Sequence, residues 1–173
     1  MQTLIAVSVL SAVLVIGVAL LIAVDTNGAI AVNIGGWQAP FGIVLVVDRL
    51  SALMLVMSAA VLLAVLVFSA GQGLADGDRE TPVSIYYPTY LILATGVFNA
   101  FVAGDLFNLY VSFEILLVAS YVLITVGGTA PRIRAGTVYI VVSLVSSVIF
   151  LAAIAMIYGA TGTVNIAQLT VRL

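Results

Sequence analysis

The sequence lacks cysteine, histidine and lysine entirely, and charged residues of any kind make up only 7% of its 173 positions. Without cysteine there is no disulfide framework, iron–sulfur cluster or thiolate metal site. Without histidine, haem ligation and most transition-metal ligation are excluded as well, so we expect neither a metal nor a cofactor. The net charge of −2 is too small to indicate a nucleic-acid partner.

What the sequence has in excess is apolar side chains. They occupy 64% of all positions, and the mean hydropathy is +1.35, whereas a soluble domain carries about 25% charged residues. Many of these residues form runs long enough to cross a hydrocarbon layer of about 30 Å as helices. The sequence therefore predicts an all-α integral membrane protein embedded in the lipid bilayer.

Five such runs predict about five transmembrane helices in a single membrane domain, residues 1–173. The expected spans are about 2–24, 49–70, 85–103, 105–126 and 135–158. No Lys or Arg precedes the first run, so we interpret it as a span, with a cleaved signal peptide as the alternative. The connection at 104–105 is so short that the third and fourth spans should be antiparallel neighbours. Small residues on the fifth span indicate close helix packing, namely Gly136, Ser143, Ser146 and Ser147.

Residues 25–48 form the one long irregular connection. Two β-prone pieces, 30–34 and 43–47, flank a stretch that contains Gly, Pro and Trp37, which predicts an external hairpin with Trp37 at the membrane interface. An irregular loop on the bilayer surface is the alternative. The loops after the second and fourth spans contain Arg79, Arg132 and Arg134, and arginine-bearing loops tend to stay in the cytoplasm. We therefore expect a cytoplasmic N-terminus.

The clearest functional signal is Glu114, which stands deep inside the fourth apolar run. It lies nine residues after Asp105 at the expected helix start, or about 13.5 Å at the helical rise, and thus near the middle of the hydrocarbon layer. An ionised carboxylate at that depth costs on the order of 2.5–3.5 kcal/mol, and such residues commonly mark proton or ion pathways. A glutamate that only packs between helices is the alternative.

Two tyrosines share the helical face of Glu114. Tyr110 precedes it by four residues and Tyr121 follows it by seven, positions that lie on one stripe of a helix. Their hydroxyls could bind the carboxylate or order water beside it, or the rings could simply fill helix interfaces. Because burial and nearby cations both change the proton affinity of a carboxylate, a moving cation could switch Glu114 between its two states.

Arg49 begins the second span next to Asp48. We interpret the two as a surface ion pair, which contributes little stability, and keep open that Arg49 instead pairs with an acid on another helix. An intramembrane hydrolase is disfavoured, because the sequence has no histidine to activate a nucleophile and no second mid-membrane acid to form a dyad.

Four blocks of the sequence carry a specific resemblance. They are GGWQAPFGI at 35–43, DRLSALM at 48–54, the run 86–124 that contains GDLFNLYVSFE, and YGATGTVNIAQL at 158–169. These blocks resemble the D-type subunit of the multisubunit Mrp-type Na⁺/H⁺ antiporter. The same superfamily includes antiporter-like membrane subunits of respiratory NADH:quinone oxidoreductase and of membrane-bound hydrogenases.

This resemblance implies a function, partners and a role for two acids. It implies a transport subunit rather than an enzyme. This subunit would exchange H⁺ for a cation, expected to be Na⁺, and would work with other antiporter subunits in the cell membrane. Glu114 matches the family's essential glutamate, which in relatives pairs with a lysine on a later helix. Asp105 matches the acid that opens the same helix.

The chain departs from the family pattern in its extent. It matches only the family's second to sixth helices, and it contains no lysine to pair with Glu114. The cation would then lie on another polypeptide, or Arg49 would replace it, or Glu114 would stay protonated. We interpret the chain as a fragment or half of a split gene. The alternatives to an antiporter subunit are a proton-pumping membrane subunit of NADH:quinone oxidoreductase or membrane-bound hydrogenase, and a non-transporting structural fragment.

Overall fold

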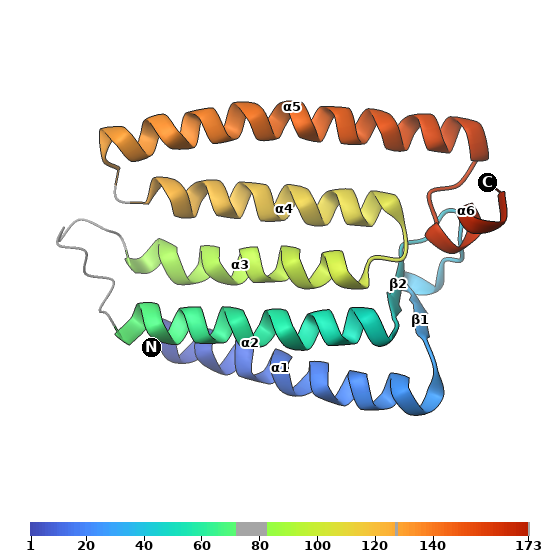
Figure 1. The fold of residues 1–173 in the computed structure, drawn as a ribbon, viewed down its shortest axis with the longest axis horizontal. Coiled ribbons are helices and arrows are strands. Elements are labelled where there is room, and N and C mark those ends of the chain that lie inside the picture. Colours follow the sequence, from blue (N-terminus) through green and yellow to red (C-terminus); the bar gives the residue numbers. More distant parts are fainter. Residues whose placement is uncertain (72–82, 127, 173) are drawn as a thin grey trace.

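The computed structural model describes residues 1–71, 83–126 and 128–172. Five long helices lie side by side with roughly parallel axes, and a small hairpin and a short helix gather at one end (Figure 1). The long helices are α1 (Gln2–Asn27), α2 (Arg49–Gly71), α3 (Val83–Val102), α4 (Leu106–Thr125) and α5 (Ala130–Thr161). The elements at the end are β1 (Ile30–Asn33), a 3-10 turn (Ile34–Gly36), β2 (Val44–Val47) and α6 (Ile166–Arg172).

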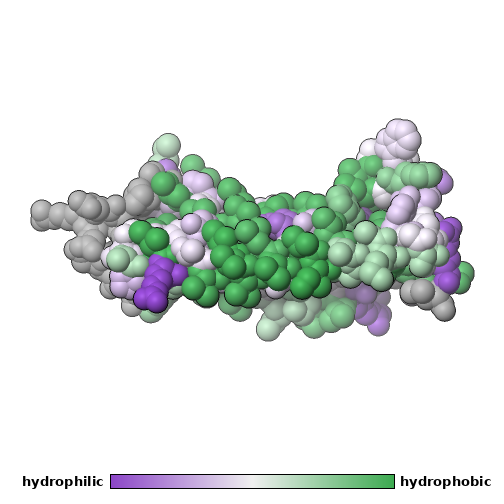
Figure 2. Space-filling view, turned by 90° about the horizontal axis from the view of Figure 1, so that it is seen from above, coloured by the Kyte–Doolittle hydropathy of each residue, from purple (hydrophilic) through white to green (hydrophobic). Residues whose placement is uncertain are grey.

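All five long helices have the length and composition of membrane spans. Large apolar side chains are exposed along them, and Figure 2 shows apolar residues over the middle of one face, with most hydrophilic residues nearer its two ends. A helix suits lipid because it satisfies its own backbone hydrogen bonds, which lipid cannot do. The prediction of an all-α integral membrane protein with five spans is confirmed.

The predicted hairpin between the first two spans is also confirmed. β1 and β2 pair antiparallel, with Ile30 opposite Val47 and Asn33 opposite Val44, so both strands lie within the predicted pieces. The turn includes an exposed Trp37. The two glycines of the 3-10 turn have positive φ, a backbone conformation that glycine adopts without steric cost.

A junction of three segments holds the start of α4. The Gly104 N–H donates to the Val44 carbonyl at 2.8 Å, and the Gly104 carbonyl accepts from the Ile166 N–H at 3.0 Å. The Leu106 N–H donates to the Val164 carbonyl at 2.9 Å. A Cβ added to Gly104 would lie 2.7 Å from the Val44 carbonyl oxygen, so this close approach requires glycine. The hairpin, α4 and the segment before α6 are thereby joined.

The helices meet in two different ways. An apolar core lies between the first three helices, formed by Ala6, Leu10, Leu66, Tyr87, Tyr90 and Ala94. α3 and α4 are antiparallel neighbours, as the short connection predicts (Figure 1). They approach closely at Gly96, where an added Cβ would lie 3.0 Å from the Ser112 carbonyl oxygen. Close backbone contact of this kind is how helices associate in lipid.

The C-terminal part differs from the prediction in two respects. α5 begins at Ala130 and ends at Thr161, so it extends beyond the predicted span of 135–158 at both ends. Its stop is Gly162, whose left-handed backbone terminates helices. The short α6 was not predicted, although the Asn165 side chain caps it by accepting from the Gln168 N–H at 3.1 Å. Arg79, used for the predicted orientation, lies outside the described residues.

Candidate functional site

Glu114 is the ninth residue of the 20 in α4, and its side chain is partly buried against α5. The Ser147 hydroxyl of α5 donates a hydrogen bond to Glu114 Oε1. Ser147 itself is only 8% exposed. Among the residues that the structure describes, the carboxylate is therefore held between two helices by a hydroxyl, and no ion pair reaches it.

Tyr110 extends this contact into a chain of three groups. Its hydroxyl lies 3.2 Å from Ser147 Oγ. A serine hydroxyl has a single proton, so when Ser147 donates to Glu114, Tyr110 is the donor to Ser147. Phe150 packs edge-on against the Tyr110 ring with centroids 5.9 Å apart. The structure thus links Tyr110 to Glu114 through Ser147, a residue for which the sequence indicates only close helix packing.

A pocket of about 210 Å³ opens between α4 and α5 beside Glu114. Its polar lining groups are Glu114, Tyr121, Tyr139, Ser143 and Ser147, and its other lining residues are leucine, isoleucine and valine. The surface that faces this space is nearly all apolar. Tyr121 therefore borders the same space as Glu114, and no hydrogen bond joins the two among the described residues.

Beyond the pocket, α4 and α5 stay in close contact. The hydroxyls of Ser120 and Tyr139 lie 2.7 Å apart. At Gly136 an added Cβ would lie 2.5 Å from a Thr125 methyl carbon and 3.4 Å from the Tyr121 ring. The glycine thus allows α5 to approach the last turn of α4, which keeps the hydroxyls of the two helices within reach of each other.

Asp105 lies outside this network, at the junction before α4. Its Oδ1 accepts from the Asn108 N–H at 2.7 Å, as an N-cap does, and its Oδ2 accepts from the Val44 N–H at 3.3 Å. The residue is 3% exposed. Asp105 therefore connects the start of the Glu114 helix to the hairpin.

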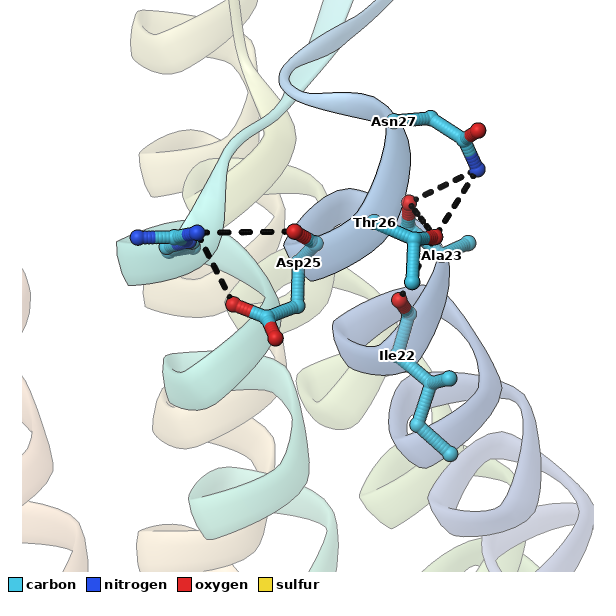
Figure 3. A network of polar contacts seen from close by, with 6 residues as sticks. Ile22, Ala23, Asp25, Thr26 and Asn27 are labelled. Carbon is cyan, nitrogen blue, oxygen red and sulfur yellow. Dashed lines mark hydrogen bonds and ion pairs between the residues drawn. The ribbon is translucent and has the colours of Figure 1, made fainter.

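Arg49 also lies away from Glu114, at the hairpin end of the molecule. Its Nη2 is 2.9 Å from Asp25 Oδ1, and the two side chains are 72% and 68% exposed. Figure 3 shows Asp25 turned toward the start of α2, while Asn27 turns away. Within the described ranges no ion pair joins Arg49 to Glu114.

The interpretation of Asp48 and Arg49 as a pair is wrong in this structure. Asp48 Oδ1 instead accepts from the Ser51 N–H at 2.7 Å and caps α2. Oxygen acceptors at this position satisfy a backbone donor that the helix itself leaves unpaired, and Arg49 is thereby left to pair with Asp25. The bound Ser51 N–H holds the pKa of Asp48 below its usual value.

A second polar cluster lies on the opposite side of α4, against α3. Asn99 donates to Asn108 Oδ1 at 3.1 Å and to Ser112 Oγ at 2.8 Å. Ser112 in turn donates to the Asn108 carbonyl at 2.7 Å. Asn108 and Ser112 are 7% and 0% exposed. These buried bonds fasten α4 to α3, so the functional groups of α4 face the other way, toward α5.

Comparison with known proteins shows which family and which relatives this chain resembles. Residues 103–172 match the family described as NADH:quinone oxidoreductase/Mrp antiporter, TM, a range that includes Asp105, Glu114 and Ser147. Over 159 residues and 92% of its length, the chain is 43% identical to the D-type subunit of the Na⁺/H⁺ antiporter of Alkalihalophilus pseudofirmus. It is a homologue of the antiporter's D-type subunit. The chain spans 31% of the length of that relative, and the resemblance inferred from the sequence blocks is confirmed.

Two solved structures share the fold of this homologue of the D-type antiporter subunit. The Mrp complex from Dietzia sp. DQ12-45-1b matches 96% of this chain and 31% of its own with a TM-score of 0.87 and 32% identity. The membrane-bound sulfane sulfur reductase, an archaeal respiratory membrane complex, matches 98% of this chain and 34% of its own with a TM-score of 0.87 and 30% identity. The fold therefore occurs in the Mrp complex and in an archaeal respiratory membrane complex.

Proposed function

We propose that this chain is the part of a cation/proton antiporter subunit in which Glu114 takes up and releases the transported proton. The observation that carries the proposal is the carboxylate in the middle of α4, which is bound by Ser147 and lies beside a pocket between α4 and α5. The homology to the D-type subunit of a Na⁺/H⁺ antiporter supports the same conclusion.

The surroundings of Glu114 suit a group that changes its protonation state. At about 1.5 Å per residue, the ninth residue of α4 lies about 12 Å from the helix start, near the midplane of a hydrocarbon layer of about 30 Å. A serine hydroxyl can donate to an ionised carboxylate and can accept from a protonated carboxyl. Ser147 can therefore remain hydrogen-bonded to Glu114 in both states, which lowers the cost of passing between them.

The proposal extends to partners and orientation. We expect the chain to work in a multisubunit complex of the cell membrane that exchanges H⁺ against Na⁺, as the names of the similar proteins suggest. The chain has no lysine, and Arg49 binds Asp25. We therefore expect a cation opposite Glu114 to come from another polypeptide of the complex. Arg132 and Arg134 favour a cytoplasmic α4–α5 connection, with the N-terminus cytoplasmic and the hairpin external.

The test is Glu114→Gln in the complete antiporter complex, assayed as Na⁺-driven proton movement in everted membrane vesicles. Glutamine keeps the size and hydrogen-bonding capacity of the side chain but cannot release a proton, so we expect nearly complete loss of exchange. Asp25→Asn is the control, because it removes an exposed acid whose ion pair contributes little. Unchanged proton flux with Glu114→Gln would leave only a structural role for the chain.

A second candidate function is proton translocation in a respiratory complex, which the similarity to the archaeal sulfane sulfur reductase favours. The helix chemistry of Glu114 would be the same, whereas the energy source would be a redox reaction in another subunit. Purification of the native complex in mild detergent decides between the two. Co-purifying flavin or iron–sulfur subunits would support the redox complex, and their absence together with Na⁺-dependent exchange would support the antiporter.

A further inference from the structure

The Ser147 hydroxyl differs from other hydroxyls of α4 and α5 in where it donates its proton. Inside a helix, serine and threonine commonly bind a carbonyl three or four residues earlier in the same helix. Hydroxyls that do so in these two helices include those of Ser112, Ser120, Thr125, Thr137 and Ser146. Ser147 donates instead to Glu114 on the neighbouring helix. Its direction is therefore set by groups of α4 and not by its own helix.

Tyr110 is the second group of α4 that binds Ser147. Its hydroxyl lies 3.2 Å from Ser147 Oγ, and it is the donor when Ser147 donates to the carboxylate. A hydroxyl that accepts one hydrogen bond becomes a better donor of the next, because each bond in such a chain polarises the following one. Tyr110 therefore strengthens the bond between Ser147 and Glu114.

Aromatic packing holds the Tyr110 ring in place. The Phe150 ring of α5 meets it edge-on with centroids 5.9 Å apart, and the Phe107 ring of α4 lies 6.3 Å from it. Phe113 in turn packs edge-on against Phe150 at 5.9 Å. Aromatic pairs of this kind are favourable beyond the burial of their surface. Tyr110→Phe would keep these ring contacts and remove only the hydroxyl.

We infer that Tyr110 is a positioning residue that acts on Glu114 through Ser147, because its hydroxyl turns the Ser147 proton toward the carboxylate. The inference rests on the proposed function of Glu114 and adds how this chain regulates the carboxylate. Ser147 is buried and Tyr110 is partly buried. Without the Tyr110 hydroxyl, Ser147 would turn for part of the time to a carbonyl of its own helix, as Ser146 does, and would release Glu114.

The first test is a double-mutant cycle in the complete complex, reconstituted in proteoliposomes and assayed as Na⁺-driven proton exchange. Ser147→Ala removes a hydrogen bond to the carboxylate and should slow exchange about tenfold. Tyr110→Phe only weakens that bond and should slow exchange about three- to tenfold. The double variant should be no slower than Ser147→Ala, since Tyr110 then has no group to act through. A double variant slowed by the product of the two factors would overturn the inference.

Matched controls come from the same types of contact elsewhere in the chain. The Tyr86 hydroxyl of α3 donates to Ser69 Oγ of α2 at 3.1 Å, so Tyr86→Phe removes a tyrosine–serine bond between two other helices. Ser146→Ala removes a hydroxyl that binds the Val142 carbonyl of its own helix. Both variants should retain the rate of the unmodified complex. Tyr86→Phe as slow as Tyr110→Phe would reduce the role of Tyr110 to helix packing.

The outcomes for Tyr110 and for Glu114 are distinguishable. Tyr110→Phe at the full rate, with Glu114→Gln inactive, would overturn the positioning role and leave the proposed function standing. An active Glu114→Gln complex would overturn both.

Infrared difference spectroscopy of the same complexes, between acidic and alkaline buffer, reports on the carboxyl group itself. The C=O stretching band of a protonated carboxyl moves to higher wavenumber when the group loses a hydrogen bond. The band of Glu114 is the one that disappears in Glu114→Gln. We expect this band to move to higher wavenumber in Ser147→Ala and in Tyr110→Phe, and to stay in place in Tyr86→Phe. An unshifted band in Tyr110→Phe would overturn the inference.

Discussion

Asp105 offers a sharp test of how the start of α4 is held. Its two oxygens bind two backbone donors from segments far apart in the chain, the Asn108 N–H at 2.7 Å and the Val44 N–H at 3.3 Å. Asp105→Ala removes both acceptors in a site that is 3% exposed, where water cannot easily replace them. The change therefore combines the loss of a helix cap with an unpaired buried N–H in β2.

The expected magnitude follows from these two contacts. Loss of an aspartate N-cap costs about 1 kcal/mol, and an unsatisfied buried N–H costs about 1–3 kcal/mol. The bond to Val44 is longer than the usual distance of about 2.9–3.0 Å, so we take the lower half of that second range. Asp105→Ala should thus destabilise the folded chain by about 2–3 kcal/mol, whereas Asp105→Asn keeps the cap and should lose only about 1 kcal/mol.

The assay is the thermal stability of the complete complex in detergent, followed by cation-driven proton exchange in vesicles. Asp48→Ala is the matched control, because Asp48 caps α2 with one bond in an exposed place and should cost about 1 kcal/mol. An Asp105→Ala complex no less stable than the Asp48→Ala complex would refute the two-bond argument. Normal stability of Asp105→Asn with loss of exchange would instead make Asp105 a proton carrier.

Two further predictions concern the same end of the molecule. Gly104→Ala should destabilise the chain by about 1–3 kcal/mol, because its Cβ would lie 2.7 Å from the Val44 carbonyl oxygen; thermal stability equal to that of the unmodified complex would contradict this. The Ser51 N–H lowers the pKa of Asp48 from 3.8. The stability that this hydrogen bond gives the folded chain is therefore present above pH 3.8 and is lost as the pH falls through the folded-state pKa of Asp48. Asp48→Asn should therefore show a smaller loss of thermal stability on acidification than the wild type, and parallel curves would contradict the assignment.

The sequence by itself determined the class of the protein, the number of spans and the place of Glu114 along its helix. These follow from local properties, since lipid accepts long apolar runs as helices and an isolated carboxylate stands out within one. The hairpin was predictable for the same reason, because β-prone pieces and the turn residues between them are neighbours in the chain. The resemblance to the D-type antiporter subunit depended on contiguous blocks such as 104–114.

The partners of Glu114 and Arg49 were decided only by the tertiary structure. Ser147 lies 33 residues from Glu114, and which serine of α5 meets the carboxylate depends on how the two helices are rotated against each other. Arg49 likewise reaches Asp25 because the hairpin brings the ends of α1 and α2 together, and Asp48 then caps its own helix. Spacing along one helix reveals which side chains share a face, but the contacts of that face depend on packing between helices.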